Sequence, residues 1–372
     1  GEGTTLNNIS QIYDARGDYG KALEYLEKSL AIRREIGDRA GEGTTLNNLA
    51  TTAYAGGDYG KALEYLEKSL AIQREIGDRA GEGTTLNNIS QVFKARGDYG
   101  KALSYLEKSL AIRREIGDRA GEGTTLNNLA TTAYAGGDYG KALEYLEKSL
   151  AISREIGDRA GEGTTLNNIS QIYDARGDYG QALAYLEKSL AITREIGDRA
   201  GEGTTLNNLA TTAYAGGDYG KALEYLEKSL AIRREIGDRA GEGRTLNNIS
   251  QIYDARGDYD QALAYLEKSL AITREIGDRA GEGRSLHNIA HIHWQNQAIE
   301  AAVANFIEAL KLARETNAAD LLFAVSRDLG DLLCQLGQKE HGLPLLEQAL
   351  AVGRQMGTPG VARVEALLRQ YR

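Results

Sequence analysis

Apolar residues recur along this chain with the spacing of amphipathic helices. Leu6 and Tyr13 each stand three or four positions from Ile9 and Ser10, which places all four on one stripe of a helix. The pattern returns in near-identical copies that begin at positions 1, 41, 81, 121, 161, 201 and 241. We call the first predicted helix of each copy helix A.

The second segment of each copy, helix B, is apolar on two sides. One stripe holds Tyr19, Ala22, Leu23, Leu26 and Leu30, and the other holds Tyr25, Ser29, Ile32 and Ile36. A helix with two apolar sides must pack against two neighbours, and a single hairpin cannot cover both. The pattern therefore predicts an all-α solenoid of stacked helical hairpins.

The dipeptide Gly-Asp separates the helices, as at Gly17-Asp18 and Gly37-Asp38. Glycine supplies the left-handed residue after one helix, and aspartate caps the start of the next. The breaks predict helix A from Arg39 to Ala55 and helix B from Tyr59 to Glu75.

Two glycines stand in the first turns of helix A. Gly41 and Gly43, which follow Ala40, each cost about 1 kcal/mol relative to alanine in a helix. We interpret their retention as a sign that neighbouring helices approach closely, with hinge-like compliance as the alternative.

The copies divide the chain into three parts. Residues 1–280 hold seven near-identical copies, odd ones with ISQIYDAR (Ile9 to Arg16) or ISQVFKAR (Ile89 to Arg96) and even ones with LATTAYAG (Leu49 to Gly56), so the larger unit comprises two hairpins. Residues 281–360 hold two divergent copies. Residues 361–372, after a helix start at Thr358-Pro359, are predicted as a capping helix. The first hairpin lacks such a cap, so either head-to-tail self-association through it or further repeats in a longer parent protein is expected.

The copies resemble the tetratricopeptide-repeat (TPR) family. The family's large, small, aromatic and glycine positions match Leu6, Ile9, Ser10, Tyr13, Gly17, Tyr19, Ala22, Leu26 and Ser29. Arg34 stands where the usual proline ends helix B, and this longer repeat unit is similar to LGN/Pins adaptors, kinesin light chains and bacterial signalling or defence TPR regions. The resemblance implies a right-handed superhelix whose helices A line a concave groove for protein or peptide segments.

The resemblance also implies which side chains face that groove. They are Asn7, Asn8, Gln11, Asn47, Asn48, Tyr54, Asn87, Asn88, Lys94, Asn127, Asn128, Tyr134, Asn167, Asn168, Asn207, Asn208, Tyr214, Asn247, Asn248, His287, Asn288, His291 and Trp294. Asn8 matches the family asparagine that bonds ligand main chain.

Asparagine is a mediocre helix former, so its paired recurrence in helix A needs an explanation. An amide can both donate to and accept from a peptide backbone of any sequence, which favours a ligand-binding ladder with tyrosines as flat anchors. The alternative is that one asparagine of each pair bonds a neighbouring helix and only stabilises the stack. The residues alone leave both readings open.

Composition and charge argue against several classes of function. A net charge of −9 gives no electrostatic footprint for nucleic acid and disfavours an anionic membrane surface. The single Cys334 excludes a disulfide framework, and no apolar run is long enough to span a bilayer. Without a signal-like start at Gly1, we expect a cytoplasmic protein or a piece of a longer one.

Candidate chemistry is sparse. His287, His291 and His293 suggest a metal cluster, but no carboxylate or cysteine is placed to complete it, so we expect no metal and no cofactor. Lys94 is isolated, which makes an acidic C-terminal peptide a poor ligand. GEGTTL lacks the third glycine and preceding strand of a dinucleotide loop, and no catalytic arrangement stands out.

We therefore expect a non-enzymatic scaffold that binds a protein or peptide. The alternative is a structural array or spacer without a specific ligand, which self-associates or is an engineered consensus protein.

Overall fold

The computed structural model describes residues 1–358 and 360–372, and this part of the chain consists of helices joined by short turns. It contains nineteen helices and no strand, which confirms the all-α prediction. Their bounds are α1 Glu2–Ala15, α2 Tyr19–Glu35, α3 Arg39–Ala55, α4 Tyr59–Ile76, α5 Arg79–Ala95, α6 Tyr99–Glu115, α7 Arg119–Ala135, α8 Tyr139–Glu155, α9 Arg159–Ala175, α10 Tyr179–Glu195, α11 Arg199–Ala215, α12 Tyr219–Glu235, α13 Arg239–Ala255, α14 Tyr259–Glu275, α15 Arg279–Gln295, α16 Ile299–Glu315, α17 Ala319–Gln335, α18 Lys339–Met356 and α19 Val361–Tyr371.

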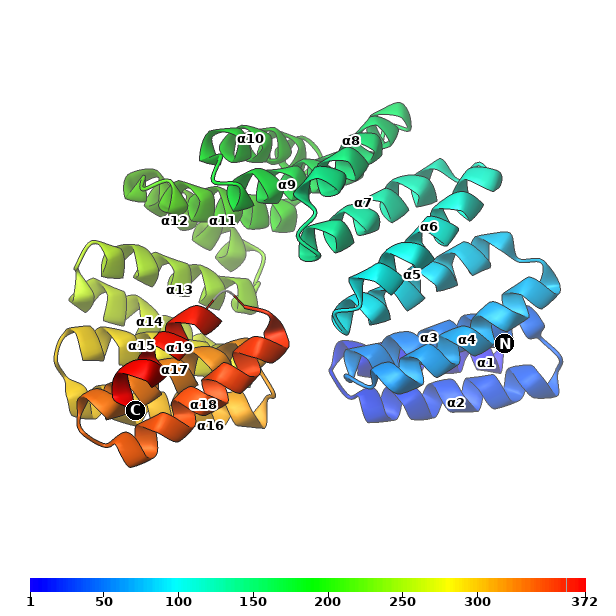
Figure 1. The fold of residues 1–372 in the computed structure, drawn as a ribbon. Coiled ribbons are helices and arrows are strands. Elements are labelled where there is room, and N and C mark those ends of the chain that lie inside the picture. Colours follow the sequence, from blue (N-terminus) through cyan, green and yellow to red (C-terminus); the bar gives the residue numbers. More distant parts are fainter. Residues whose placement is uncertain (359) are drawn as a thin grey trace. The chain divides into compact units, whose positions relative to one another are not determined.

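The helices pair into hairpins, and the chain divides into two compact units, Gly1–Ile192 and Thr193–Arg372. Within each unit, helix A packs against helix B of its own copy, and helix B also packs against helix A of the next copy (Figure 1). Each unit is therefore a solenoid of stacked hairpins. The predicted bounds of helix A are confirmed, and helix B of the second copy extends one residue further, to Ile76.

The Gly-Asp breaks act as predicted. Gly17 has φ +74°, the left-handed conformation that ends α1, and Gly37 has φ +70° at the end of α2. Asp18 then accepts a hydrogen bond from the backbone N–H of Lys21 at 3.2 Å, at the start of α2. These paired devices fix the turn between successive helices.

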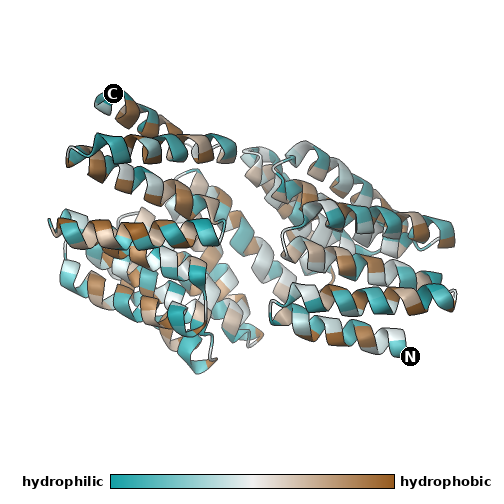
Figure 2. Cartoon of the chain, turned by 90° about the horizontal axis from the view of Figure 1, so that it is seen from below, coloured by the Kyte–Doolittle hydropathy of each residue, from teal (hydrophilic) through white to brown (hydrophobic). Residues whose placement is uncertain are grey.

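The core lies between hairpins as well as within them. Leu26 of α2 and Leu46 and Leu49 of α3 are fully buried in one cluster with Ile72 of α4, so α3 is covered by helix B of two successive copies. Figure 2 shows hydrophobic and hydrophilic residues side by side on the helices. Burying each leucine contributes roughly 1.5–3 kcal/mol, which no isolated hairpin can obtain in full.

One predicted core position is wrong. Ile36 is 68% exposed, and its counterparts in later copies, such as Ile76 at 40%, are also exposed. Ile36 follows the last residue of α2, so it lies beyond the turns that pack against the neighbouring helices.

The interpretation of Gly41 also needs correction. A Cβ at Gly41 would collide with the capping carboxylate of Asp38 and with Arg33, whereas one at Gly43 would meet Ile72 at an ordinary 3.5 Å. At Gly81, the collision with the capping aspartate recurs although Gln73 replaces the arginine. Gly41 therefore leaves room for the side chains of Asp38 and Arg33, rather than for the backbone of a neighbouring helix.

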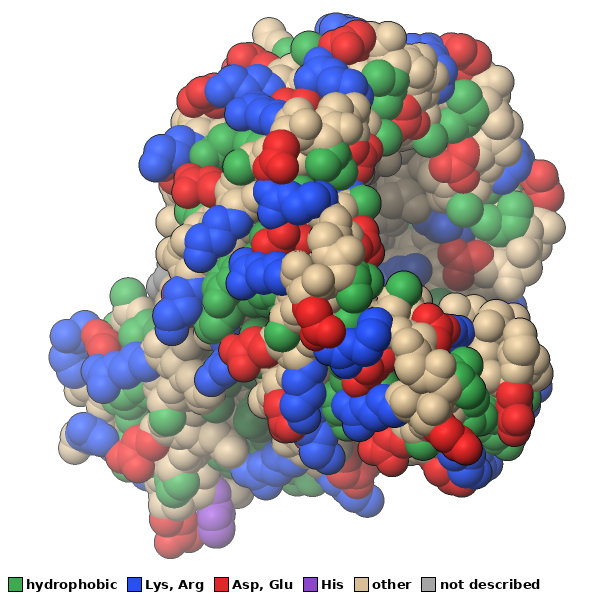
Figure 3. Space-filling view, turned by 90° about the vertical axis from the view of Figure 1, so that its right-hand side faces the viewer, with side chains coloured by type: hydrophobic (Ala, Val, Ile, Leu, Met, Phe, Trp, Pro, Cys, Tyr) green, Lys and Arg blue, Asp and Glu red, His purple; other side chains and the backbone are tan. Residues whose placement is uncertain are grey.

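Charged side chains also join neighbouring copies. Glu42 is 5% exposed and accepts from Arg34 Nε at 2.7 Å and from Arg39 Nη1 at 2.6 Å, while Arg39 also pairs with Glu75. Burial alone would raise the pKa of Glu42, but the two arginines hold it below its ordinary value. Figure 3 shows acidic and basic side chains interspersed on the face it presents.

The end of the chain forms the predicted additional helix. Val364, Leu368 and Tyr371 of α19 are buried against the last hairpin, and Tyr371 Oη donates to Asp331 at 2.6 Å. The predicted start at Thr358-Pro359 involves Pro359, which lies outside the described residues; the helix itself begins at Val361. In the described chain, no helix has the length and apolarity needed to cross a membrane.

Candidate functional site

The surface of helix A that faces away from the core carries the candidate residues. We call it the helix-A face, and it consists of the residues at positions 4, 8, 11 and 14 of each copy. Gln11 is exposed, as are Thr51 and Tyr54 of the second copy. The second asparagines of the interior copies, such as Asn88, are half-buried beside them.

The first asparagine of each pair points into the stack. Asn47 Nδ2 donates to Ser69 Oγ and to Thr85 Oγ1, both at 2.8 Å, and so joins α3 to α4 and α5. Asn127, two copies later, makes the equivalent two bonds. In the first copy, Asn7 Nδ2 lies 3.4 Å from Thr45 Oγ1. These amides connect three successive helices.

The second asparagine donates to the first asparagine of the preceding copy. We call this series of side-chain bonds the amide ladder; it comprises Asn88 to Asn47 at 3.3 Å, Asn128 to Asn87 at 2.8 Å, Asn168 to Asn127 at 3.2 Å, Asn248 to Asn207 at 3.0 Å and Asn288 to Asn247 at 2.9 Å. Asn8 is exposed in the first copy, and Asn7 Oδ1 is buried without a partner among the described residues. Both asparagines of an interior pair therefore take part in holding the stack.

The ladder does not use every polar atom of these amides. In the described chain, Oδ1 of Asn88 and Oδ1 of Asn168 accept no hydrogen bond, while Nδ2 of each is held by the ladder. The ladder thus fixes the side chain and leaves an acceptor available.

Two equivalent hollows lie on the helix-A face of the first unit. The first measures about 190 Å³, and the second about 300 Å³. The first is lined by Ala50, Thr51, Tyr54, Leu66, Asn88, Gln91 and Val92, and the second by the same positions two copies later together with Lys94 and Ala135. Each hollow combines an apolar floor, a tyrosine ring and the available amide oxygen.

The tyrosine of each hollow results from a one-residue shift between odd and even copies. In the first copy, Tyr13 stacks on Tyr25 of helix B, with ring centroids 5.4 Å apart. In the second copy, Ala53 takes that position and Tyr54 follows, with its ring 5.4 Å from Tyr59. One residue rotates a side chain by about 100° around the helix. The aromatic ring of even copies is therefore carried from the hairpin interior to the helix-A face.

The charged residues near this surface, Lys94, Asp174 and Asp254, are partly buried. Lys94 Nζ donates to Thr131 Oγ1 at 2.9 Å, and burial lowers the pKa of this lysine. One carboxylate oxygen of Asp174 and one of Asp254 are buried without a partner among the described residues. Burial raises the pKa of Asp254, against the opposing charge of His291.

The histidines of the eighth copy have separate surroundings. His287 Nε2 lies 2.9 Å from Asp328 Oδ2, and these two residues replace the asparagines of the last ladder rung. His291 contacts the Trp294 ring edge-on, with centroids 6.2 Å apart. Among the described residues, no three His, Cys, Asp or Glu side chains come together in a way that could hold a metal ion.

Sequence reasoning missed two arginines. Arg244 and Arg284 take position 4 of adjacent copies, where the six preceding copies have threonine, and both line one pocket of the second unit. The sequence does contain a signal for them, because an arginine that replaces threonine in otherwise near-identical copies is a clear difference.

Comparison with known families gives matches over most of the chain. A family model described as "Tetratricopeptide repeat" matches residues 1–75, 41–115, 121–195 and 201–275, and a second model of the same description matches residues 283–316. No curated protein sequence matched the chain.

Several solved structures share the fold at low sequence identity. The signal transduction ATPase PH0952 from Pyrococcus horikoshii, which has a tetratricopeptide repeat sensor, aligns with a TM-score of 0.61 and 18% identity over 86% of this chain and 49% of its own. The apo quorum sensor NprR from B. thuringiensis aligns with 0.59 and 17% over 82% and 87%. Aspartyl phosphate phosphatase F from Bacillus subtilis aligns with 0.61 and 15% over 97% and 95%.

Proposed function

Because this chain belongs to the tetratricopeptide-repeat family, we propose that it is a non-enzymatic scaffold whose helix-A face binds a peptide segment of a protein partner. The observation that carries this proposal is the recurrence of one hollow in successive even copies of the first unit. Each copy of the hollow offers the same tyrosine, amide oxygen and apolar floor. A surface with a repeated chemical unit suits a ligand that is itself extended along the stack.

The chemistry of the lining residues suggests which part of the ligand each of them contacts. Tyr54 and Tyr134 supply flat anchors for apolar side chains, since aromatic residues in partly desolvated pockets dominate binding energies. Asn88 Oδ1 and Asn168 Oδ1 accept main-chain N–H groups of the ligand. Their Nδ2 groups are already bonded in the amide ladder, so little side-chain entropy is lost on binding.

The test is selection of binding peptides from a random library against the whole chain, followed by affinity measurement with variants. The double variant Y54A/Y134A should weaken binding at least about tenfold, which corresponds to about 1.4 kcal/mol. The matched control is I76A/I156A. Ile76 and Ile156 belong to the same hairpins, are 40% and 41% exposed, and follow or end helix B, outside both hollows.

The control should leave affinity unchanged, and neither double variant should move the unfolding midpoint by much. Equal loss of binding in both double variants would contradict the proposal. So would selected peptides that bind Y54A/Y134A as tightly as the unaltered chain.

Self-association is a second candidate, and one observation favours it. Ile12 of α1 is 53% exposed, while its counterparts Ile172 and Ile252 are each 1% exposed. A second copy seated on α1 would cover this apolar face. Light scattering across a concentration series should then show growth that the variant I12K abolishes, and a constant monomer mass would exclude this candidate.

A further inference from the structure

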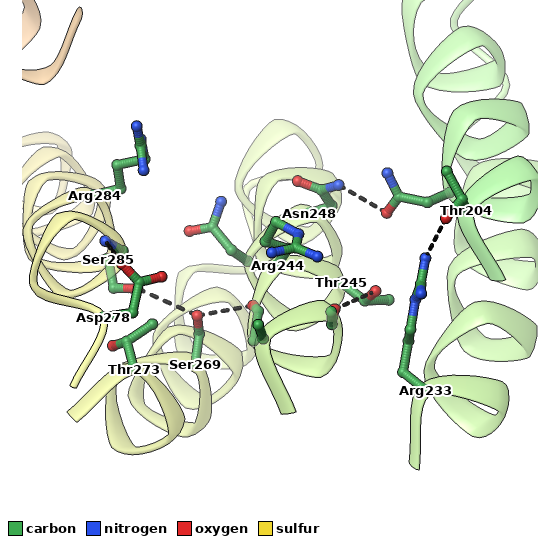
Figure 4. Close-up of a pocket in the computed structure, with 16 residues that line it drawn as sticks. Thr204, Arg233, Arg244, Thr245, Asn248, Ser269, Thr273, Asp278, Arg284 and Ser285 are labelled. Carbon is green, nitrogen blue, oxygen red and sulfur yellow. Dashed lines mark hydrogen bonds between the residues drawn. The ribbon is translucent and has the colours of Figure 1, made fainter. Parts of the chain in front are cut away.

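Position 4 of helix A changes its chemistry in two adjacent copies. Threonine stands there in the first six copies, and Arg244 and Arg284 replace it in the seventh and eighth. Both arginines line a pocket of about 420 Å³ beside α13 and α15, where Asn247 and Ser285 also contribute (Figure 4).

This pocket contains space that an arginine fills in the preceding copy. There, Arg233 of α12 reaches Thr204 Oγ1 at 2.6 Å and Asp238 at 2.8 Å. One copy later the equivalent residue is Thr273, whose hydroxyl bonds back to the carbonyl of Leu270 at 3.0 Å. The shorter side chain leaves the volume above it open.

The donors in the pocket are incompletely used. Within the described chain, the Arg244 guanidinium has no hydrogen-bond or ion-pair partner, and Asn247 Nδ2 lacks the bonds that Asn47 Nδ2 makes to serine and threonine. Arg284 pairs with Asp320 at 3.2 Å, but both side chains are about half exposed, at 51% and 59%. Exposed pairs of this kind contribute about 0–1 kcal/mol, so a ligand can compete for Arg284.

One acidic residue, Asp278, lines the same pocket and opposes an anion there. Its Oδ1 accepts from the backbone N–H of Gly281 at 2.8 Å at the start of α15, where the helix dipole offsets part of its charge. Arg233 also lines the pocket but is held by Thr204 and Asp238. The guanidinium groups of Arg244 and Arg284 add to it, whereas the one carboxylate among the lining residues is already engaged as a helix cap.

We propose that this pocket binds an anionic group of the partner, a carboxylate or a phosphate, through bidentate hydrogen bonds from Arg244, with Arg284 and Asn247 as supporting donors. Planar guanidinium groups match oxyanions of both kinds. The inference rests on the proposed function for its biological setting. It makes the second unit selective for charge, whereas the hollows of the first unit select apolar side chains.

The first experiment measures inorganic phosphate binding to the whole chain by calorimetry at low salt, without any peptide. Phosphate should bind saturably, and R244Q should weaken its affinity at least tenfold. R256Q is the matched control, because Arg256 is an exposed residue at the opposite end of α13 and its loss changes the net charge equally. Equal weakening by R244Q and R256Q would show a general charge effect and overturn the proposal.

Two further variants test whether the pocket itself is the site. T273Q introduces the glutamine that the second copy carries at this position, fills space without adding charge, and should weaken phosphate binding severalfold. D278N keeps a capping side chain and removes the opposing charge, so it should tighten binding. Unchanged affinity in both variants would place the anion elsewhere and overturn the proposal.

Paired peptides distinguish the two sources of the anion. A phosphoserine peptide, the same peptide with glutamate and a serine control should rank differently if phosphate is preferred, and the first two should be equal if a carboxylate suffices. Y54A/Y134A should leave inorganic phosphate binding intact. Failure of the anion site and failure of the hollows are therefore separate results.

Discussion

At the scale of single residues, the near-identical copies serve as internal comparisons. The amide ladder is neutral between interior copies, but its last rung is the pair of His287 and Asp328. Asp328 also accepts two hydrogen bonds from Arg327, at 2.6 and 2.9 Å. One position of a shared hydrogen-bond series has thus become ionisable, and its contribution to stability depends on pH.

We predict an acid-sensitive contribution from Asp328. Burial alone would raise the pKa of this carboxyl, but the hydrogen bonds from His287 and Arg327 lower it from 3.8 to about 2. Because the folded pKa lies below the unfolded one, the stabilisation is complete above 3.8 and is lost as pH falls toward 2. Its size is about 2 kcal/mol.

The measurement is Tm between pH 5 and pH 2 for the unaltered chain and for D328N, which restores the asparagine of the other copies. The difference in Tm should shrink as pH falls through this window. D320N removes an exposed carboxylate nearby and should leave the pH profile unchanged. A constant difference between D328N and the unaltered chain would refute the prediction.

The structural role of a residue was predictable from the sequence where the local backbone alone determines that role. The left-handed glycines and capping aspartates follow from backbone geometry alone. The fate of the asparagines could not be predicted, because each amide has partners on α-helices one copy away, and the choice depends on how far helices are offset when they stack. The role of Arg244 does not follow from the repeat pattern, because the pattern is defined by the residues that the copies share and Arg244 is one of their differences.

At the scale of secondary-structure elements, the junction between helix B and the next helix A differs between copies at one position. Three of the near-identical copies have arginine there, and the others have glutamine, serine or threonine. Where arginine is present, Arg113 pairs with the capping Asp118 at 2.6 Å, and only 13% of the arginine side chain is exposed. Where Gln73 takes its position, Asp78 caps Gly81 without an arginine partner, at 2.8 Å.

We predict that D118A destabilises the chain more than D78A. Both lose a helix cap, which costs about 1 kcal/mol. D118A also leaves the largely buried guanidinium of Arg113 with only its bond to Thr84 and without its carboxylate, which adds about 1–3 kcal/mol. Urea unfolding of the two variants makes the comparison, and equal shifts of the midpoint would show that the Arg113 pair contributes nothing.

The course of the helices was predictable almost to the residue, since the Gly-Asp breaks bound every interior helix of the near-identical copies. The exposure of Ile36 was not, because helical periodicity continues to mark a position as inward-facing after the neighbouring helix has ended. The one-residue shift of the tyrosine between odd and even copies was visible in the sequence. The hollow beside Tyr54 was not, because it also depends on how far α3 and α5 are offset along the stack.

At the scale of the whole molecule, stability is a sum of neighbouring contacts rather than a property of one core. Within each unit of the described chain, a hairpin touches only the hairpins next to it, and α19 covers the last one. Damage at one end should therefore remain local.

Deletion of residues 361–372 tests this expectation. Loss of α19 exposes Leu346 and Phe323 and removes the bond between Tyr371 and Asp331. Hydrogen exchange should accelerate in α17 and α18, while α3 to α8 keep their protection. The point variant L368D should reproduce the effect with the helix present, and uniform loss of protection along the chain would contradict the prediction.

The recurrence of the hollows in alternate copies has a consequence for valency. Gain or loss of one pair of hairpins by recombination within the gene would add or remove a complete binding element without altering any side chain. A ligand with regularly spaced apolar residues would then change its avidity in multiplicative steps, because each added hollow acts at high effective concentration. The affinity for such a ligand could thus evolve through the number of hollows, while the residues that line each hollow stay the same.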